Sequence, residues 1–131
     1  MVDQELAGRS ARLTFTVGEA DLAPALGSGD VPVLATPRMI AWLEAATVAA
    51  VADALPPDVA SVGIAVEIDQ VAASVIGSEI TASATVRGVR SKTLVFACEA
   101  IAESGEPAVI GHGTITRALV DRQRFLARLG S

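Results

Sequence analysis

One carboxyl group lies where the sequence provides almost only apolar side chains. Residues 39–52 read MIAWLEAATVAAVA, and Glu44 is the single ionisable residue among them. A helix that is apolar on nearly all sides has to be buried, and a buried carboxylate costs free energy unless it is paired or protonated. Because proteins often use groups that they keep at such a cost, Glu44 is the first candidate for a general base or a nucleophile. The structural alternative is a carboxylate that only accepts hydrogen bonds from the sheet or from a partner subunit.

A hydroxyl group stands at the start of the same segment. Thr36 precedes Pro37, a pair that is typical of a helix start and predicts Thr36 as the N-cap. A chemical role is compatible with capping if the hydroxyl also faces a pocket. Thr36 and Glu44 are eight residues apart, or about 12 Å along a regular helix. A joint site therefore needs substrate between them, or one of the two residues from a second subunit.

The remaining reactive residues give weaker signals. His112, the single histidine, lies in the predicted strand that contains GHGT, and a structural role is favoured for it. Cys98 lies in the apolar run TLVFACEAIA and is expected to be a small buried side chain. No pair of His or Cys residues has zinc-finger spacing, so no metal site is expected, and GHGT lacks the spacing of a phosphate loop. No cofactor is expected.

The hydrophobic pattern predicts five strands and one long helix. The alternation of apolar and polar residues predicts strands at 10–18, 62–68, 79–87, 92–103 and 108–120, and the helix lies between 36 and 55. A Gly-, Pro- and Asp-rich loop is expected at 19–35, and an amphipathic tail at 121–130. Consecutive strands joined by short turns form an antiparallel sheet. The expected architecture is α+β, with one antiparallel sheet against one helix, in a single domain at 1–131.

Two further expectations concern assembly and partners. The helix is apolar on more sides than one sheet can cover, which predicts a homodimer. The net charge of −5 and an aromatic content of 3% argue against nucleic acid as a partner. The apolar segment is too short to span a membrane and is interrupted by Glu44. A single cysteine and an N-terminus without a signal-peptide pattern predict a cytoplasmic protein without membrane contact.

Three segments carry a resemblance to a known family. The resemblance is to the fluoroacetyl-CoA-specific thioesterase-like branch of the hotdog superfamily, and it covers roughly residues 10 to 129. The segments that carry it are ATPRMIAWLEAATVAAV, SVGIAVEIDQVAASVIGSEI and GHGTITRALVDRQRF. The resemblance implies a hotdog fold, in which about five antiparallel strands wrap around one long central helix. It also implies a homodimer or a dimer of dimers, and hydrolysis of short acyl-CoA thioesters. In that family a threonine at the helix start, a glutamate eight residues later and a histidine on the next strand act together.

The resemblance assigns these roles to residues of this chain. Thr36 matches the hydroxyl and Glu44 matches the acid. Gly63, in the Ser-Val-Gly turn at 61–63, matches the glycine that approaches the thioester carbonyl, and Arg117 matches the arginine of the last strand; both are expected to bind substrate. Gln70 stands where the family has its histidine. Glutamine orients water or donates to a carbonyl, but it does not carry a proton near neutral pH.

The sequence therefore leads to one main hypothesis and two alternatives. The main hypothesis is an acyl-CoA thioesterase for short or medium acyl groups, with Glu44 active, Gln70 orienting, and the site at a dimer interface. The loop before the helix has no aromatic residue, so specificity for fluoroacetate is not expected. The first alternative is a non-catalytic acyl-CoA or CoA-binding protein, motivated by Gln70. The second is a hotdog hydratase, which would need a histidine near the helix.

Overall fold

A computed structural model describes residues 4–130 of the chain. The strands are β1 (Ser10–Thr16), β2 (Val59–Gln70), β3 (Glu79–Arg90), β4 (Thr93–Ala102) and β5 (Ala108–Asp121), and the helices are α1 (Ala23–Leu26), α2 (Thr36–Val51) and α3 (Arg122–Arg128). Two single-turn 3-10 helices, η1 (Gln4–Leu6) and η2 (Glu19–Asp21), complete the described elements. Within residues 4–130, no helix is long and apolar enough to cross a membrane.

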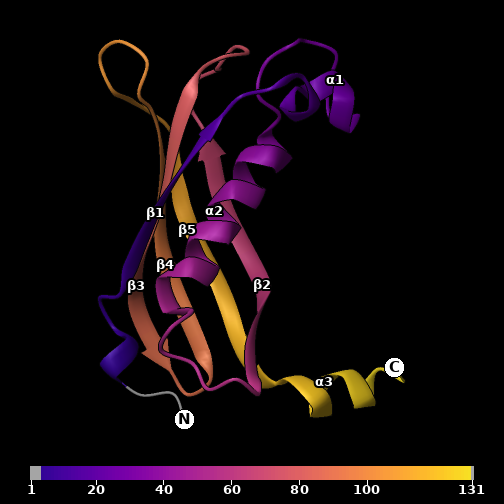
Figure 1. Cartoon of the computed structure of the whole chain (residues 1–131), viewed down its shortest axis with the longest axis vertical. Helices are drawn as coiled ribbons and strands as arrows, with labels where there is room; N and C mark the ends of the chain where they lie inside the picture. The colour runs from indigo at the N-terminus through magenta and orange to yellow at the C-terminus, as the bar shows by residue number, and fades with distance from the viewer. Residues whose placement is uncertain (1–3, 131) are drawn as a thin grey trace.

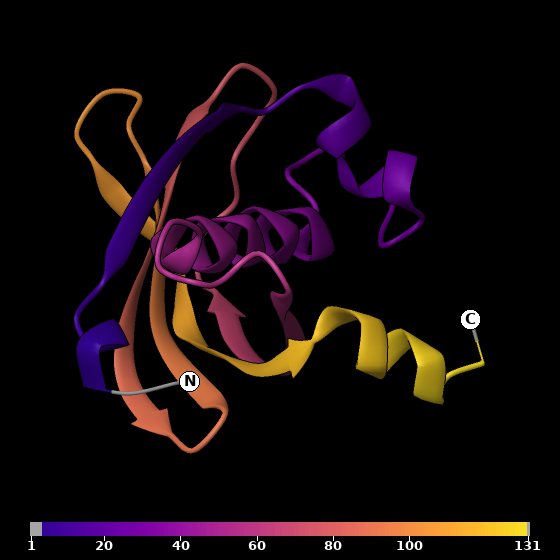
Figure 2. The ribbon, with the colours of Figure 1, turned by 60° about the horizontal axis from the view of Figure 1, so that its bottom comes forward.

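The five strands form one antiparallel sheet in the order β1-β3-β4-β5-β2. The sheet curves around α2, which crosses its concave face (Figure 1). Viewed after rotation, α2 lies inside the curl of the sheet, while α3 projects away from it (Figure 2). The predicted α+β architecture, an antiparallel sheet wrapped around one long helix, is confirmed. The strands β1 and β2 are the two edges of the sheet.

The side of α2 that faces the sheet forms the centre of the core. Met39, Leu43 and Ala46 are completely buried there, and they pack with Phe96 and Ile115 from the central strands. Burying one leucine side chain of this kind contributes about 2 kcal/mol to folding. The opposite side of α2 is less covered, which agrees with the expectation that one sheet does not shield the whole helix.

A bulge changes the pattern of β2. The register with β5 shifts between Gly63 and Ala65, so Ile64 is an extra residue in the ladder. A simple alternation places residues 62, 64, 66 and 68 on one face, and that prediction is wrong for the first half of the strand. Before the bulge Gly63 lies opposite Arg117, and after it Val66 lies opposite Ile115. The bulge therefore puts Gly63 and Val66 on the same, helix-facing side.

Two local predictions need correction. The N-cap of α2 is Ala35, and no side chain caps this helix, so Thr36 is its first helical residue. The loop predicted at 19–35 contains η2 and α1, and α1 ends at Leu26, followed by Gly27 with a left-handed φ of 70°. The amphipathic tail forms α3 as expected, and the side chain of Asp121 caps it by accepting a hydrogen bond from the N–H of Arg124.

Candidate active site

The side chain of Glu44 points from α2 toward β2 and β5. Its Oε2 accepts a hydrogen bond from Nη1 of Arg117 at 3.3 Å, across 73 residues of sequence. A Cβ placed on Gly63 would lie 2.5 Å from the same oxygen. The carboxylate thus occupies the space that a side chain at position 63 would need. This close approach is what requires a glycine at position 63. The backbone conformation does not require one, because the φ of Gly63 is not left-handed.

Glu44 is less buried than the sequence predicted. Its side chain is 39% exposed, whereas the side chain of Arg117 is 9% exposed. The expectation of a carboxylate surrounded only by apolar groups is therefore wrong. The carboxylate is paired on its inner side and open to water on its outer side, an arrangement that leaves room for a water molecule or a substrate.

Ser61 fixes the position of Arg117. The hydroxyl oxygen of Ser61 accepts from Nε of Arg117 at 2.8 Å, and its backbone carbonyl accepts from Nη2 at 3.0 Å. Burial lowers the pKa of the Arg117 guanidinium, and the charge and hydrogen bond of Glu44 act in the opposite direction. The guanidinium therefore serves as a fixed positive support for the carboxylate. Sequence reasoning gave Ser61 no role of its own, because this contact joins residues that are 56 positions apart.

Thr36 and Gln70 form a second pair. The hydroxyl of Thr36 donates to Oε1 of Gln70, and Nε2 of Gln70 donates to the carbonyl of Ala72 at 3.3 Å. Both residues line a groove of about 510 Å³ between the segments 28–36 and 70–73. The amide of Gln70 is held at both ends, so its orientation is fixed.

The predicted site residues thus form two clusters within one chain. Glu44, Gly63 and Arg117 lie together, and Thr36 and Gln70 lie together at the N-terminal end of α2. Eight helical residues, about 12 Å, separate Thr36 from Glu44. The roles that sequence reasoning gave to these five residues remain predictions.

His112 and Cys98 lie outside both clusters. His112 is exposed and is paired in register with Asp69 and Glu99, on the face of the sheet that is turned away from α2. Cys98 is buried, and burial raises the pKa of its thiol to about 12, although a hydrogen bond with the Ile115 backbone acts in the opposite direction. Within residues 4–130, no group of three or more His, Cys, Asp and Glu side chains is placed to hold a metal ion.

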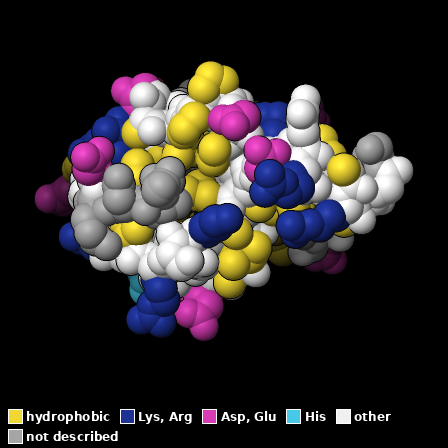
Figure 3. Space-filling model, turned by 90° about the horizontal axis from the view of Figure 1, so that it is seen from below, with side chains coloured by type: hydrophobic (Ala, Val, Ile, Leu, Met, Phe, Trp, Pro, Cys, Tyr) yellow, Lys and Arg dark blue, Asp and Glu magenta, His cyan; other side chains and the backbone are white. Residues whose placement is uncertain are grey.

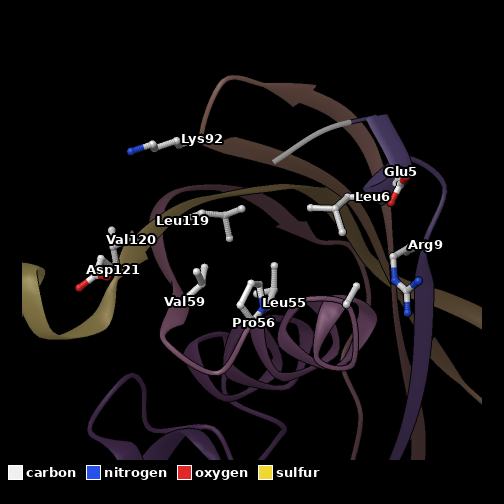
Figure 4. A pocket seen from close by; sticks show the side chains of 11 residues that line it. Glu5, Leu6, Arg9, Leu55, Pro56, Val59, Lys92, Leu119, Val120 and Asp121 are labelled. Atoms are coloured by element: carbon white, nitrogen blue, oxygen red, sulfur yellow. The ribbon is translucent and has the colours of Figure 1, made fainter. Parts of the chain in front are cut away.

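A cavity of about 420 Å³ lies beyond the C-terminal end of α2. Leu6, Leu55, Val59 and Leu119 point into it, whereas the charged end of Lys92 points away (Figure 4). Glu5, Arg9 and Asp121 also line the cavity, so its wall is mixed, and Glu44 is not among its lining residues.

Comparisons with known proteins bear on the family and the fold of the chain. The profile of the family FlK, described as fluoroacetyl-CoA-specific thioesterase, matches residues 17–123. The solved structure of the fluoroacetyl-CoA thioesterase FlK is similar with a TM-score of 0.85 and 28% identity, over 94% of this chain and 93% of that one. A variant of FlK in complex with acetyl-CoA is similar with a TM-score of 0.84 and 27% identity, over 94% and 95% of the two chains. No curated protein matches the sequence significantly.

More distant structures share the fold. A hot-dog-like protein from Thermanaerovibrio acidaminovorans has a TM-score of 0.87 at 22% identity, over 98% of this chain and 95% of that one. The Thermus thermophilus thioesterase superfamily member TTHA0967 has a TM-score of 0.85 at 22% identity, over 94% and 89% of the two chains. The hotdog fold that the sequence predicted is confirmed, and so is its resemblance to the fluoroacetyl-CoA-specific thioesterase family. The chain belongs to the family of fluoroacetyl-CoA-specific thioesterases, and it is a hydrolase of thioester bonds.

Proposed function

We propose that the protein hydrolyses short or medium acyl-CoA thioesters with Glu44 as its catalytic carboxylate. The observation that carries this proposal is the placement of Oε2 against Gly63, where any larger residue would collide with it. In this scheme the thioester carbonyl lies beside Gly63, and Glu44 accepts a proton from water as the water attacks the carbonyl carbon. Collapse of the tetrahedral intermediate breaks the C–S bond, and the proton passes to the leaving thiolate. Direct attack by Glu44 on the carbonyl is the alternative role, and the exposed side of the carboxylate favours the water-activating role.

Stabilisation of the oxyanion comes from groups near Gly63. The bulge between Gly63 and Ala65 interrupts the β2 ladder at this point, and bulges of this kind are frequent beside active sites. We assign the oxyanion contact to the backbone N–H of Gly63, with Gln70 or Thr36 as the second donor. Arg117 binds the carboxylate of Glu44 and keeps it oriented. Substrate binding by Arg117, which the family resemblance implies, stays a prediction.

The complete site requires a homodimer. β2 is an edge strand with exposed Ile64 (58%) and Val66 (41%), and Val48 on α2 is 45% exposed. Antiparallel pairing of two β2 edges about a two-fold axis places the C-terminal end of one strand beside the N-terminal half of the other. The Thr36–Gln70 pair of one protomer then lies beside the Glu44 carboxylate of its partner. This arrangement joins the two clusters that a single chain keeps apart.

The test is thiol release from a panel of acyl-CoA thioesters by the wild type and by Glu44→Gln. The amide keeps the shape of the side chain and removes the base, so kcat is expected to fall by about 10²- to 10⁴-fold. The amide oxygen retains the hydrogen bond that Arg117 donates, but the nearly buried guanidinium loses its counter-charge, so thermal stability is expected to fall as well. Turnover by Glu44→Gln at the wild-type rate would exclude this mechanism.

The alternative is a protein that binds acyl-CoA or CoA without hydrolysing it. It is favoured by one observation: the Gln70 amide is engaged with Thr36 and Ala72 and carries no titratable proton. Calorimetric binding of CoA thioesters without thiol release in the same buffer would support this alternative. We also propose a cytoplasmic location, which is consistent with one buried, unpaired cysteine.

A further inference from the structure

The C-terminal helix α3 has an apolar side that is open to solvent. No residue of α3 is buried, and Leu126, together with Leu129 directly after the helix, is exposed to 46% and 66% respectively. Phe125 lies on the same side, because residues three and four positions apart share a helix face. Arg128 follows Phe125 at the border of this side, whereas Gln123 lies on the opposite side. The helix therefore presents an apolar surface with a positive border.

α3 leaves the sheet at the start of β2. Asp121, the last residue of β5, is paired with Val59, the first residue of β2, and the N–H of Arg122 donates to the carbonyl of Asp58 at 2.8 Å. From there α3 projects beyond the β2 edge (Figure 1, Figure 2). On this end of the molecule, dark-blue Lys and Arg side chains lie beside yellow hydrophobic side chains (Figure 3). A protein that pairs with the β2 edge therefore also meets α3.

A surface of complementary chemistry lies at the other end of β2. The groove that contains Thr36 and Gln70 is also lined by Asp30, Val31 and Val71. The two valines are exposed to 59% and 57%. Asp30 is exposed as well, and the ion pairs found within residues 4–130 do not include it. The groove thus offers apolar side chains and an unpaired carboxylate, which match the apolar side and the arginine border of α3.

Within one chain, α3 does not reach this groove. β2 has 12 residues, or about 40 Å at the rise of an extended strand, and α3 and the groove lie at its opposite ends. α3 has seven residues, or about 10 Å. Antiparallel pairing of two β2 edges about a two-fold axis removes this separation, because the start of one β2 then lies beside the end of the other. The projecting helix of one protomer arrives at the groove of its partner.

We propose that α3 of each protomer docks into the Thr36–Gln70 groove of a second copy of the chain. Leu126 and Leu129 cover the partner's Val31 and Val71, and Arg128 pairs with the partner's Asp30. The inference rests on the homodimer of the proposed function, and it makes α3 a wall of the partner's site. A membrane surface also suits a basic amphipathic helix, but it leaves the valines and the carboxylate of the groove uncovered.

A disulfide across the interface tests the docking directly. Leu126→Cys and Val71→Cys are introduced into the same chain, in which the native Cys98 is buried. Because the two positions lie at opposite ends of β2, a bond between them joins two chains, and a non-reducing gel shows a covalent dimer. Docking holds the two thiols at a high effective concentration. We therefore expect this dimer to form at least about tenfold faster than with the control pair Leu126→Cys and Arg12→Cys, since Arg12 is exposed on the opposite edge of the sheet. Peptide mass spectrometry identifies the 126–71 bond.

Leu126→Glu tests the same contact without a new bond, and Gln123→Glu is its matched control. Both variants add one negative charge to α3, but only position 126 lies on the apolar side. We expect Leu126→Glu to raise the dimer dissociation constant by about tenfold or more in analytical ultracentrifugation, because it removes an apolar contact and brings a carboxylate near the partner's Asp30. Gln123→Glu should keep the wild-type value.

A charge exchange tests the ion pair. Arg128→Glu and Asp30→Arg should each weaken the dimer, and the chain that carries both changes should regain its stability, because the pair is restored with opposite sense. Absence of this rescue would remove Arg128 and Asp30 from the interface.

These measurements separate the inference from the proposed function. A covalent 126–71 dimer in a protein that hydrolyses no acyl-CoA would leave the docking in place and remove the function. Hydrolysis by a dimer that forms no 126–71 bond, with equal dissociation constants for Leu126→Glu and Gln123→Glu, would overturn the docking and leave the function. A monomeric wild-type protein would overturn the docking as well. Binding to phosphatidylserine vesicles that Leu126→Glu abolishes, at an unchanged dimer dissociation constant, would assign α3 to a membrane surface and also overturn it.

Discussion

The residues around Glu44 depend on one another. The carboxylate needs the empty space at Gly63, and its orientation needs Arg117. Arg117 is in turn held by two contacts with Ser61. Because each group takes its position from the next, small changes at this site are expected to act on catalysis more than on stability.

Gly63→Ala tests the close approach. The new Cβ would lie 2.5 Å from Oε2 of Glu44 and 3.3 Å from Nη1 of Arg117, so the carboxylate has to move. A displacement of about 1 Å costs roughly 10²-fold in rate, and we expect a loss in kcat/KM of that size. The matched control is Gly88→Ala, whose Cβ would meet Val95 at an ordinary 3.7 Å. Equal activity of Gly63→Ala and Gly88→Ala would contradict the proposed placement of the carboxylate.

Gln70→His tests whether a proton-carrying side chain at position 70 increases the rate of hydrolysis. Imidazole beside Thr36 can transfer a proton near neutral pH, which an amide cannot do. We expect thiol release to rise about tenfold, with a new pH-dependent limb near the usual histidine pKa of about 6.5. Initial rates from pH 5 to 9 provide the measurement. A lower or unchanged rate with every acyl-CoA would show that the site does not use a proton carrier at position 70.

At the scale of single elements, β2 and β4 illustrate how a strand acts through its neighbours. The bulge in β2 puts Gly63 and Val66 on the same, helix-facing side of the sheet. Without it, Gly63 and Val66 would lie on opposite faces. β4 lies between β3 and β5 and places Cys98 on the buried face. The environment of this thiol is therefore a property of the packed sheet.

The raised pKa of Cys98 predicts a loss of stability in base. Burial raises the pKa of this thiol from its ordinary value of 9.0 to about 12 in the folded chain. Above pH 9 the unfolded chain releases this proton and the folded chain keeps it, so unfolding becomes more favourable as pH rises toward 12. The contribution at pH 10 is about 1.4 kcal/mol. Urea unfolding at pH 8 and pH 10 measures it, and Cys98→Ala should lose this part of the pH dependence. An identical pH dependence in both proteins would exclude the thiol as its source.

At the scale of the whole molecule, the apolar surface near β2 is the main unexplained feature of a single chain. The exposed side chains of Val48, Ile64 and Val66 lie on α2 and on an unpaired sheet edge. An edge of this kind favours pairing with another strand. In the dimer that we propose, a second copy of the chain provides both the missing strand and the cover for α2.

Val66→Lys tests this assembly. A lysine on an edge strand opposes strand pairing, so we expect the wild-type protein to be a dimer in light scattering and the variant to dissociate. If the composite site is correct, thiol release should fall together with the dimer fraction, by about tenfold or more at low protein concentration. The control is Val75→Lys, since Val75 is exposed to 62% but lies in the loop after β2. A dimeric, fully active Val66→Lys protein would rule out the β2 interface.

The sequence by itself determined the elements and the family. The apolar segment around Glu44 and the alternating segments after Pro57 predict the helix and the strands, because helical and strand periods are local properties of the chain. Residues 36 and 44 were identified from the sequence pattern, and residues 63, 70 and 117 from the resemblance to the family. Their roles remain to be tested.

Only the tertiary structure decided how these residues are grouped. It separates Thr36 and Gln70 from Glu44, ties Arg117 to Ser61, and opens one side of the Glu44 carboxylate to solvent. These results depend on the bulge in β2 and on two contacts of Arg117: with Ser61, at a sequence separation of 56 positions, and with Glu44, at a separation of 73 positions. Strand register and long-range pairing follow from the packing of the complete sheet against α2, and local patterns do not contain that information.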